Sequence, residues 1–299
     1  GRTVYKGYLF TGDVLLSEGS MRDHPLTPMT DPSLVRVMQR QCRRRVGLIE
    51  HTVVRRGSEA IARRIAALRA EGVGIAIVDA LDDADLNAMG RAFATLPLLT
   101  AGSGVAIGLP ANFGVSPSAA AVELPTSAGA RAIVSGSCSV ASNAQVAAFL
   151  ARHPQRGFAV DPLRLAAGED VAAAALDWAG SRLGDEPLLV YATAQPEAVK
   201  AVQAALGVEA AGALVERSLA RIAQGLVARG GGRLVVAGGE TSGACVQALG
   251  VRRLQIGPAI CPGVPWTMAE GRPLWLALKS GNFGGPGFFA EALALSEGA

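Results

Sequence analysis

A short apolar run that meets a glycine-rich turn and then a helical run constrains the fold of this chain most. Residues 233–243 read RLVVAGGETSG, and a helical pattern continues to Leu249. In α/β proteins this order presents backbone N–H groups to an anion, because glycines admit close approach and a helix N-terminus is partly positive. A second such loop, KSGNFGG at 279–285, follows the apolar run 274–278. Together the two loops predict phosphate binding.

The same alternation of strand-like and helical segments runs along the chain and predicts an α/β fold. After a hairpin-like start at 4–16, we expect strands at 46–54, 74–78, 96–100, 132–134, 157–160 and 188–192. We expect helices at 58–70, after Asp82, at 170–183 and at 209–229. Such alternation is typical of mostly parallel sheets flanked by helices, with ligands at the carboxyl ends of strands.

The segment 110–125 lacks a clear period and is rich in Ser, Pro and Ala, which is typical of a connection between domains. We therefore predict two domains, residues 1–128 and 129–299, with the boundary near 126–130. The predicted phosphate loops both fall in the second domain.

Composition excludes several classes of protein. The chain of 299 residues is 50% hydrophobic and 18% charged, with a mean hydropathy of +0.31, which excludes a disordered chain. Each apolar run is interrupted before it reaches the length of a membrane span, and the first residues lack the charged-then-apolar pattern of a secretory signal. The four cysteines form no CxxC pair, so we expect free thiols in a cytoplasmic protein without a membrane partner.

The net charge is only +3, but ten arginines lie between Arg36 and Arg69. They could form a nucleic-acid surface or the solvated faces of helices. The second reading is favoured because no aromatic interleaving and no nucleic-acid motif accompanies them, so we expect no nucleic-acid partner.

The turn after the strand at 234–236 is the central candidate site. Its backbone N–H groups would bind phosphate oxygens, the hydroxyls of Thr241 and Ser242 would add donors, and Glu240 could hold Mg²⁺ through water. It matches neither GxxxxGK[ST] nor GxGxxG, which disfavours a P-loop and a Rossmann dinucleotide site. A purely structural helix entry is the alternative. The candidate positions are Gly238, Gly239, Glu240, Thr241, Ser242 and Gly243.

Two further loops supply candidates in the second domain. In the 279–285 loop, Lys279 beside Gly281 and Asn282 could place a compact charge on a phosphate, or could be a surface lysine at a strand end. The alternating hydroxyls of Ser135, Ser137 and Ser139 could contact a ligand or cap the helix that follows.

In the first domain, Gly102-Ser103-Gly104 follows a predicted strand and could line a cleft between the domains. The loop 20–32 carries His24 between Asp23 and Pro25, where it could contact an acid substrate or lie exposed without a role.

These motifs together resemble a known family, the four-carbon acid sugar kinases (DUF1537), which include 3-oxo-tetronate, threonate and erythronate kinases. The segments that carry the resemblance are GSMRDHPLTPMTD (19–31), VVDALDDADL (77–86), VSGSCS (134–139), VVAGGETSG (235–243), IGPAICPGVPW (256–266) and LALKSGNFGG (276–285). They extend over nearly the whole chain, and their combination is specific.

The resemblance implies a sugar-acid-binding first domain and an ATP-binding second domain, with the reaction between them. It places the serine turn, the turn from Gly238 to Thr241 and Gly281 on ATP-binding positions, and His24 with Gly102-Ser103-Gly104 on the sugar side. The family normally opens with an Asp-Asp-Phe-Thr-Gly motif, which occurs nowhere in this sequence. We therefore expect a truncated form and leave the catalytic base unassigned.

The resulting hypothesis is a kinase that uses ATP and Mg²⁺ to phosphorylate the terminal hydroxyl of a four-carbon sugar acid, and a homodimer is compatible with it. The alternative is a non-catalytic nucleotide-binding or effector protein that keeps the fold. A nicotinamide oxidoreductase is a third reading, but its glycine signature is missing.

Overall fold

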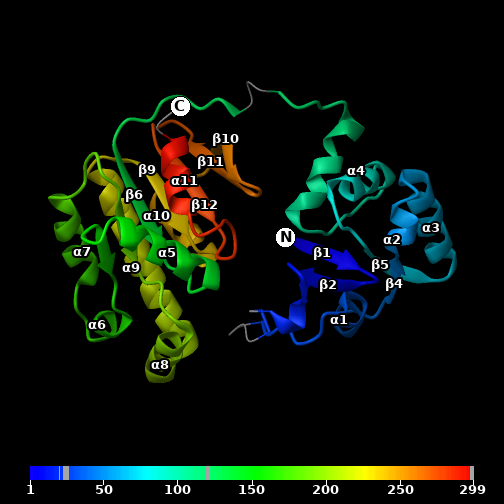
Figure 1. The fold of residues 1–299 in the computed structure, drawn as a ribbon, viewed down its shortest axis with the longest axis horizontal. Coiled ribbons are helices and arrows are strands. Elements are labelled where there is room, and N and C mark those ends of the chain that lie inside the picture. Colours follow the sequence, from blue (N-terminus) through cyan, green and yellow to red (C-terminus); the bar gives the residue numbers. More distant parts are fainter. Residues whose placement is uncertain (20, 23–26, 119–121, 297–299) are drawn as a thin grey trace. The chain divides into compact units, whose positions relative to one another are not determined.

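The computed structural model describes residues 1–19, 21–22, 27–118 and 122–296, with the side chains of residues 196 and 197 left undescribed. It divides into two compact units, Gly1–Pro117 and Ser118–Ala299 (Figure 1). This division does not test the predicted functional boundary at 128/129, which stays a prediction.

Unit 1 begins with an antiparallel three-stranded sheet and continues with a parallel pair of strands flanked by helices. Its elements are β1 (Arg2–Tyr5), β2 (Tyr8–Thr11), β3 (Val14–Leu15), η1 (Leu16–Glu18), α1 (Leu34–Gln41), β4 (Arg45–Ile49), α2 (His51–Val54), α3 (Ser58–Ala70), β5 (Val73–Val78), α4 (Asp83–Ala92), η2 (Ser103–Gly108) and η3 (Pro110–Phe113).

The core of unit 1 lies where α3 and α4 pack on the β4–β5 pair. The apolar positions of α3 recur at helical spacing, so that Ile61 and Leu68 face inward with Ile49 of β4 and Met89 of α4. Ile61 and Ile49 are completely buried, and each such side chain contributes about 1.5–3 kcal/mol of hydrophobic stabilisation.

Two strand predictions in unit 1 are wrong. The predicted strand 46–54 ends at Ile49, because Glu50 caps α2 and the chain turns into that short helix. The predicted strand 96–100 is irregular chain. Leu96 and Leu99 pack on the core of unit 1, while Leu98 is 80% exposed. The apolar residues of this segment therefore contribute to packing although the segment pairs with no strand in the described part of the chain.

Unit 2 is a seven-stranded sheet with helices on both faces, in the strand order β10-β11-β12-β9-β6-β8-β7. Its elements are β6 (Ala130–Ser135), α5 (Val140–Arg152), β7 (Gly157–Ala159), α6 (Pro162–Ala166), α7 (Val171–Gly180), β8 (Leu188–Tyr191), α8 (Pro196–Leu206), α9 (Val208–Ala228), β9 (Gly231–Ala237), α10 (Gly239–Ala248), β10 (Leu254–Cys261), β11 (Val264–Ala269), β12 (Trp275–Lys279) and α11 (Phe288–Leu295).

Strands β12, β9, β6, β8 and β7 are parallel, and β10 and β11 extend the sheet as antiparallel strands. The parallel strands are continuous apolar runs because helices cover both faces. One core holds α7, α9 and α10 against the sheet, and the other holds α5 and α11 (Figure 1). The predicted α/β architecture with mostly parallel strands is confirmed.

A buried carboxylate ties the start of unit 1 to its parallel strands. Asp79 follows β5 and is completely buried. It accepts hydrogen bonds from the backbone N–H groups of Lys6 (2.7 Å), Gly7 (2.8 Å) and His51 (2.9 Å). Lys6 has a φ of +53° and Gly7 one of +76°, so the carboxylate holds a left-handed β1–β2 turn against the start of α2.

We expect Asp79→Ala to lower the free energy of unfolding by roughly 2–4 kcal/mol, because three N–H groups lose a charged acceptor. The measurement is urea denaturation followed by circular dichroism. Asp83→Ala, at an exposed position in the first turn of α4, is the matched control and should cost less than about 1 kcal/mol. Equal midpoints for the two variants would contradict the role given to Asp79.

Candidate functional site

Three loops of unit 2 meet at the carboxyl ends of adjacent parallel strands. Strands β6, β9 and β12 end side by side, with Ser135 in register with Ala237 and Ala237 in register with Lys279. The serine turn after β6, the glycine turn after β9 and the 279–285 loop after β12 therefore leave the sheet at one edge. The structure brings together the loops that the sequence singled out in the second half of the chain.

The carboxyl ends of the neighbouring strands β6 and β9 form a topological switch point. The loop after β6 leads to α5 on one face of the sheet, and the loop after β9 leads to α10 on the other face. Where neighbouring strands send their helices to opposite faces, their loops diverge and leave a crevice, which is the usual ligand position in open α/β sheets.

The glycine turn supplies open N–H donors to this crevice. Gly238 has a φ of +130° and is the N-cap of α10, which has no side-chain cap. Among the described residues, the backbone N–H groups of Gly239, Glu240 and Thr241 donate to no acceptor. A Cβ built on Gly239 or Gly243 would meet no atom within 4 Å. Unpaired donors, open space and the positive end of a ten-residue helix together suit an anion.

The hydroxyls of the turn point elsewhere. Thr241 is 4% exposed, and its Oγ1 would lie 2.2 Å from a Cβ on Gly136 and 2.8 Å from one on Gly238. Ser242 Oγ is buried and has no hydrogen-bond partner among the described residues. Thr241 therefore packs the serine and glycine turns together, and the exposed surface of the turn consists of Gly239, Glu240 and Gly243.

The serine turn is mainly a scaffold. Ser135 is completely buried and its hydroxyl bonds that of Thr193 at 2.7 Å. Ser139 caps α5 by accepting from Ser142 N, and it donates to Gly281 O at 2.6 Å. Ser137 donates to Ser139 Oγ at 3.2 Å. The capping that the sequence left open as an alternative is what Ser139 does.

Lys279 is not a surface lysine. Its side chain is completely buried at the end of β12, and its ammonium donates to Gly281 O at 2.8 Å and to Ser142 Oγ at 3.2 Å. A Cβ on Gly281 would lie 2.4 Å from Ser137 Oγ, so only glycine fits between the lysine and the serine turn. Asn282, also predicted to bind the nucleotide, follows in the same loop.

Sequence reasoning missed Gln145, which anchors the glycine-rich loop. Its side-chain amide on α5 donates to the carbonyls of Phe283, Gly284 and Gly285 at 3.0–3.1 Å. Gln145 is completely buried and lies about 140 residues before its partners. A glutamine within an amphipathic helix gives no local signal of such a contact.

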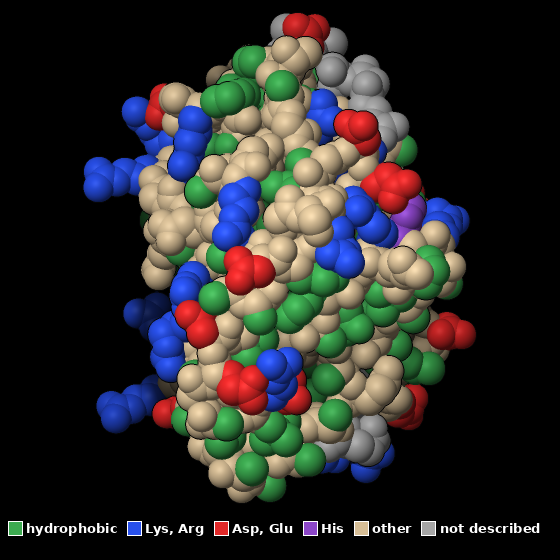
Figure 2. Space-filling model, turned by 90° about the vertical axis from the view of Figure 1, so that its left-hand side faces the viewer, with side chains coloured by type: hydrophobic (Ala, Val, Ile, Leu, Met, Phe, Trp, Pro, Cys, Tyr) green, Lys and Arg blue, Asp and Glu red, His purple; other side chains and the backbone are tan. Residues whose placement is uncertain are grey.

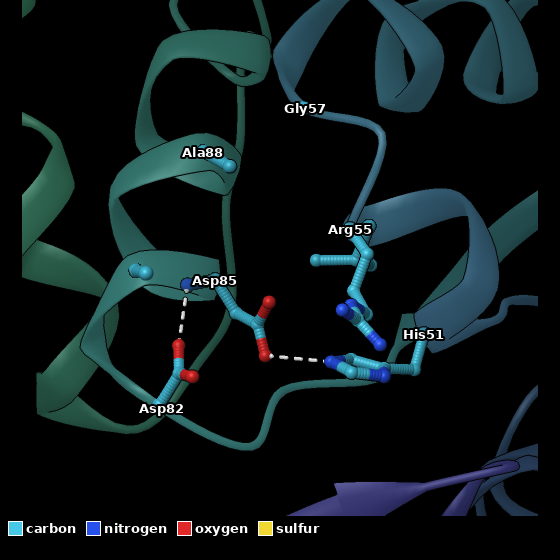
Figure 3. A pocket seen from close by; sticks show the side chains of 8 residues that line it. His51, Arg55, Gly57, Asp82, Asp85 and Ala88 are labelled. Atoms are coloured by element: carbon cyan, nitrogen blue, oxygen red, sulfur yellow. Dashed lines mark hydrogen bonds and ion pairs between the residues drawn. The ribbon is translucent and has the colours of Figure 1, made fainter.

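Unit 1 has a cavity of about 360 Å³ beyond the carboxyl ends of β4 and β5, lined by His51, Arg55, Gly57, Asp82 and Asp85 among others (Figure 3). His51 Nε2 lies 3.1 Å from Asp85 Oδ2, which also accepts from Leu81 N at 2.8 Å. Sequence analysis assigned no binding role to these residues, because only the fold brings α2 and α4 together.

The predicted sugar-side residues Gly102, Ser103 and Gly104 do not line this cavity. Gly102 and Ser103 are exposed at the start of η2, and Gly104 packs near Leu86 of α4. His24 lies outside the described residues. The binding roles of all four residues stay predictions.

No group of three or more His, Cys, Asp or Glu side chains that could hold a metal ion occurs among the described residues. In the same part of the chain, no single helix is long and apolar enough to cross a membrane, although α8 and α9 together meet the length and composition test across a bend of 107°.

Some arginines of the arginine-rich stretch pair with acids of their own unit. Arg36 lies 2.7 Å from Asp31, and Arg64 lies 2.8 Å from Glu71. On the face of unit 2 in Figure 2, Lys and Arg side chains are scattered among acidic and apolar ones. These arrangements are typical of solvated surfaces.

Family models match both units. A nucleotide-binding C-terminal domain matches residues 132–289, and a sugar-binding N-terminal domain matches residues 1–109. A 3-oxo-tetronate kinase of Cupriavidus necator is 57% identical over 98% of this chain and 68% of its own length. One of Pseudomonas fluorescens is 56% identical over the same shares. The chain belongs to this family of sugar-acid kinases.

Solved structures agree with this assignment. A protein of Salmonella typhimurium LT2 superimposes with a TM-score of 0.76 at 40% identity, over 98% of this chain and 70% of that one. A DUF1537 protein of Haemophilus influenzae gives a TM-score of 0.66 at 37% identity, over 99% and 71%. The predicted membership, and the placement of the nucleotide-binding domain in the C-terminal half, are confirmed.

Burial lowers the pKa of Lys279 to about 8, while the unfolded chain holds its proton up to about 10.5. The folded protein therefore carries the cost of a buried charge below pH 8, and this cost is relieved as the pH rises from about 8 toward 10.5. We expect the free energy of unfolding of the parent to rise, relative to that of Lys279→Met, between pH 7 and pH 9.5 in urea titrations.

The control for this prediction is Lys200→Met, which removes an exposed lysine on α8. Its free energy of unfolding should differ from that of the parent by the same amount at every pH. A Lys279→Met curve parallel to that of the parent would show that the buried amine does not titrate in this window.

Proposed function

We propose that this chain phosphorylates the terminal hydroxyl of a four-carbon sugar acid, such as 3-oxo-tetronate, at the expense of ATP. The observation that carries the proposal is the row of three backbone N–H groups at the start of α10 that find no acceptor in the described part of the chain, inside the segment that matches a nucleotide-binding domain. The names of the relatives supply the acceptor, and the sugar-binding match on unit 1 supports it.

The proposed role of unit 2 is to hold the phosphates of ATP. Main-chain donors of Gly239 and Glu240 would meet the phosphate oxygens, and the interlocked loops behind them would keep these donors in place. Phosphoryl transfer depends on such fixed positive groups, because its transition state spreads negative charge over the phosphoryl oxygens.

Mg²⁺ enters this proposal as the companion of ATP and would neutralise charge on its phosphates. Glu240 is the carboxylate of the turn, is exposed and stands in the first turn of α10. It suits a contact through water, since Mg²⁺ usually keeps several of its waters.

The activity test incubates the chain with ATP, Mg²⁺ and 3-oxo-tetronate and measures ADP release. We expect ADP release that depends on both the acid and the metal. Nucleotide binding by calorimetry without any turnover would instead favour a non-catalytic nucleotide-binding protein. The same experiments run at several protein concentrations would test the predicted homodimer, which stays a prediction.

Gly239→Val tests the phosphate site directly. A Cβ at this position meets no protein atom within 4 Å, so the variant should fold while its side chain takes up the space proposed for a phosphate. We expect the Kd for ATP, measured by calorimetry, to rise at least tenfold, about 1.4 kcal/mol.

The matched control is Gly180→Val at the exposed end of α7, where a Cβ also meets nothing within 4 Å. Its affinity for ATP should equal that of the parent. If a folded Gly239→Val protein bound ATP with the affinity of the parent, the proposed placement of the phosphates at this turn would be wrong.

A further inference from the structure

The cavity of unit 1 contains a cation that lacks an acid to pair with. Within the described part of the chain, the Arg55 guanidinium makes no ion pair or hydrogen bond, whereas Arg36 and Arg64 of the same unit are bound to carboxylates. Figure 3 shows Arg55 on the side of the cavity opposite Asp85 and α4. An unpaired guanidinium at a cavity is suited to a ligand carboxylate, which it can bind with two parallel hydrogen bonds.

Across the cavity, Asp85 keeps one carboxylate oxygen available. The residue is 6% exposed, and its Oδ2 accepts from His51 Nε2 and from Leu81 N. No hydrogen bond to Oδ1 occurs among the described residues, and Figure 3 shows the second oxygen turned into the cavity. A carboxylate oxygen that is open to the cavity and has unused acceptor capacity is suited to a hydroxyl donor.

The remaining lining keeps these two groups apart and accessible. Asp82 accepts from Asp85 N at 3.0 Å and so fixes the start of α4. Gly57, the N-cap of α3, has a φ of +88°, and a Cβ there would meet nothing within 4 Å. The cavity of about 360 Å³ falls within the range of small-molecule sites.

We infer that this cavity binds a small hydroxy acid, with the ligand carboxylate on Arg55 and a neighbouring hydroxyl on Asp85. The inference rests on the proposed function, because it takes the sugar acid as the ligand. His51 is a positioning residue in this arrangement: its Nε2–H occupies one oxygen of Asp85 and directs the other toward the ligand.

Other ligand classes fit the lining less well. A phosphate carries about 1.5 to 2 negative charges near neutral pH, more than the one arginine of the lining can balance beside Asp82 and Asp85, whereas a carboxylate carries a single charge. A neutral polyol would leave the guanidinium without a partner. A metal ion lacks a cluster of three suitable side chains among the described residues.

The test is calorimetry on the full chain with D-erythronate and with erythritol, which has the same carbon chain but no carboxylate. We expect the parent to bind erythronate and to bind erythritol far more weakly. Arg55→Gln should weaken erythronate binding about 10- to 100-fold, and its affinity for ATP should not change. Asp85→Asn should weaken both compounds, with circular dichroism to establish that it is folded.

Arg56→Gln is the control, since Arg56 is exposed like its neighbour Arg55 but does not line the cavity. It should bind erythronate as the parent does. Equal erythronate affinity in Arg55→Gln and the parent, or no preference of the parent for erythronate over erythritol, would overturn the inference.

These outcomes are separate from those of the activity test. If the chain binds erythronate through Arg55 but releases no ADP, the inferred site stands and the proposed activity is wrong. If the parent releases ADP with 3-oxo-tetronate and Arg55→Gln does so at an unchanged KM, the proposed activity stands and the inferred site is wrong.

Discussion

The candidate nucleotide site depends on the close packing of the serine turn against Gly281. Gly281 has room for no side chain, because a Cβ would lie 2.4 Å from Ser137 Oγ, and its carbonyl accepts from Ser139, Ser142 and Lys279. Gly238 N in turn donates to Lys279 O. The loops after β6, β9 and β12 are thereby fixed by contacts with one another. The donors of one loop satisfy the acceptors of the next, and the N–H groups of Gly239, Glu240 and Thr241 at the start of α10 are left without an acceptor among the described residues.

The two units place their candidate binding groups by the same topological means but with different chemistry. In both, these groups lie beyond the carboxyl ends of parallel strands, where loops and helix starts converge. In unit 2 the exposed groups are backbone donors, which bind oxygen atoms of any anion. In unit 1 they are side chains of opposite charge, Arg55 and Asp85, which distinguish a carboxylate from a hydroxyl. Backbone donors for a phosphate and charged side chains for a small acid are the combination that a sugar-acid kinase requires.

Sequence reasoning succeeded where the signal was local. The helix at 58–70 was predicted with its observed bounds, because its apolar spacing is contained within the segment. The strand–turn–helix at 234–249 was found for the same reason. It failed where a contact with a distant segment decides the conformation. The predicted strand at 46–54 breaks after Ile49, where Asp79 binds the N–H of His51 from 28 positions away. The anchoring role of Gln145 depends on carbonyls about 140 positions away.

For Lys279 the sequence allowed two predictions, a charge that contacts a phosphate or a surface lysine at a strand end, and the burial of the side chain distinguishes between them. As a surface lysine, it would be free to reach a phosphate as a mobile charge. The structure instead encloses its ammonium between Ser142 and Gly281, with the Phe288 ring 5.8 Å away. A charge held there cannot swing toward a ligand without releasing Gly281, so its field reaches the crevice while its hydrogen bonds support the loop. Burial of the charged ammonium lowers the stability of the protein near neutral pH. The same burial fixes the loop after β12 behind the proposed phosphate position.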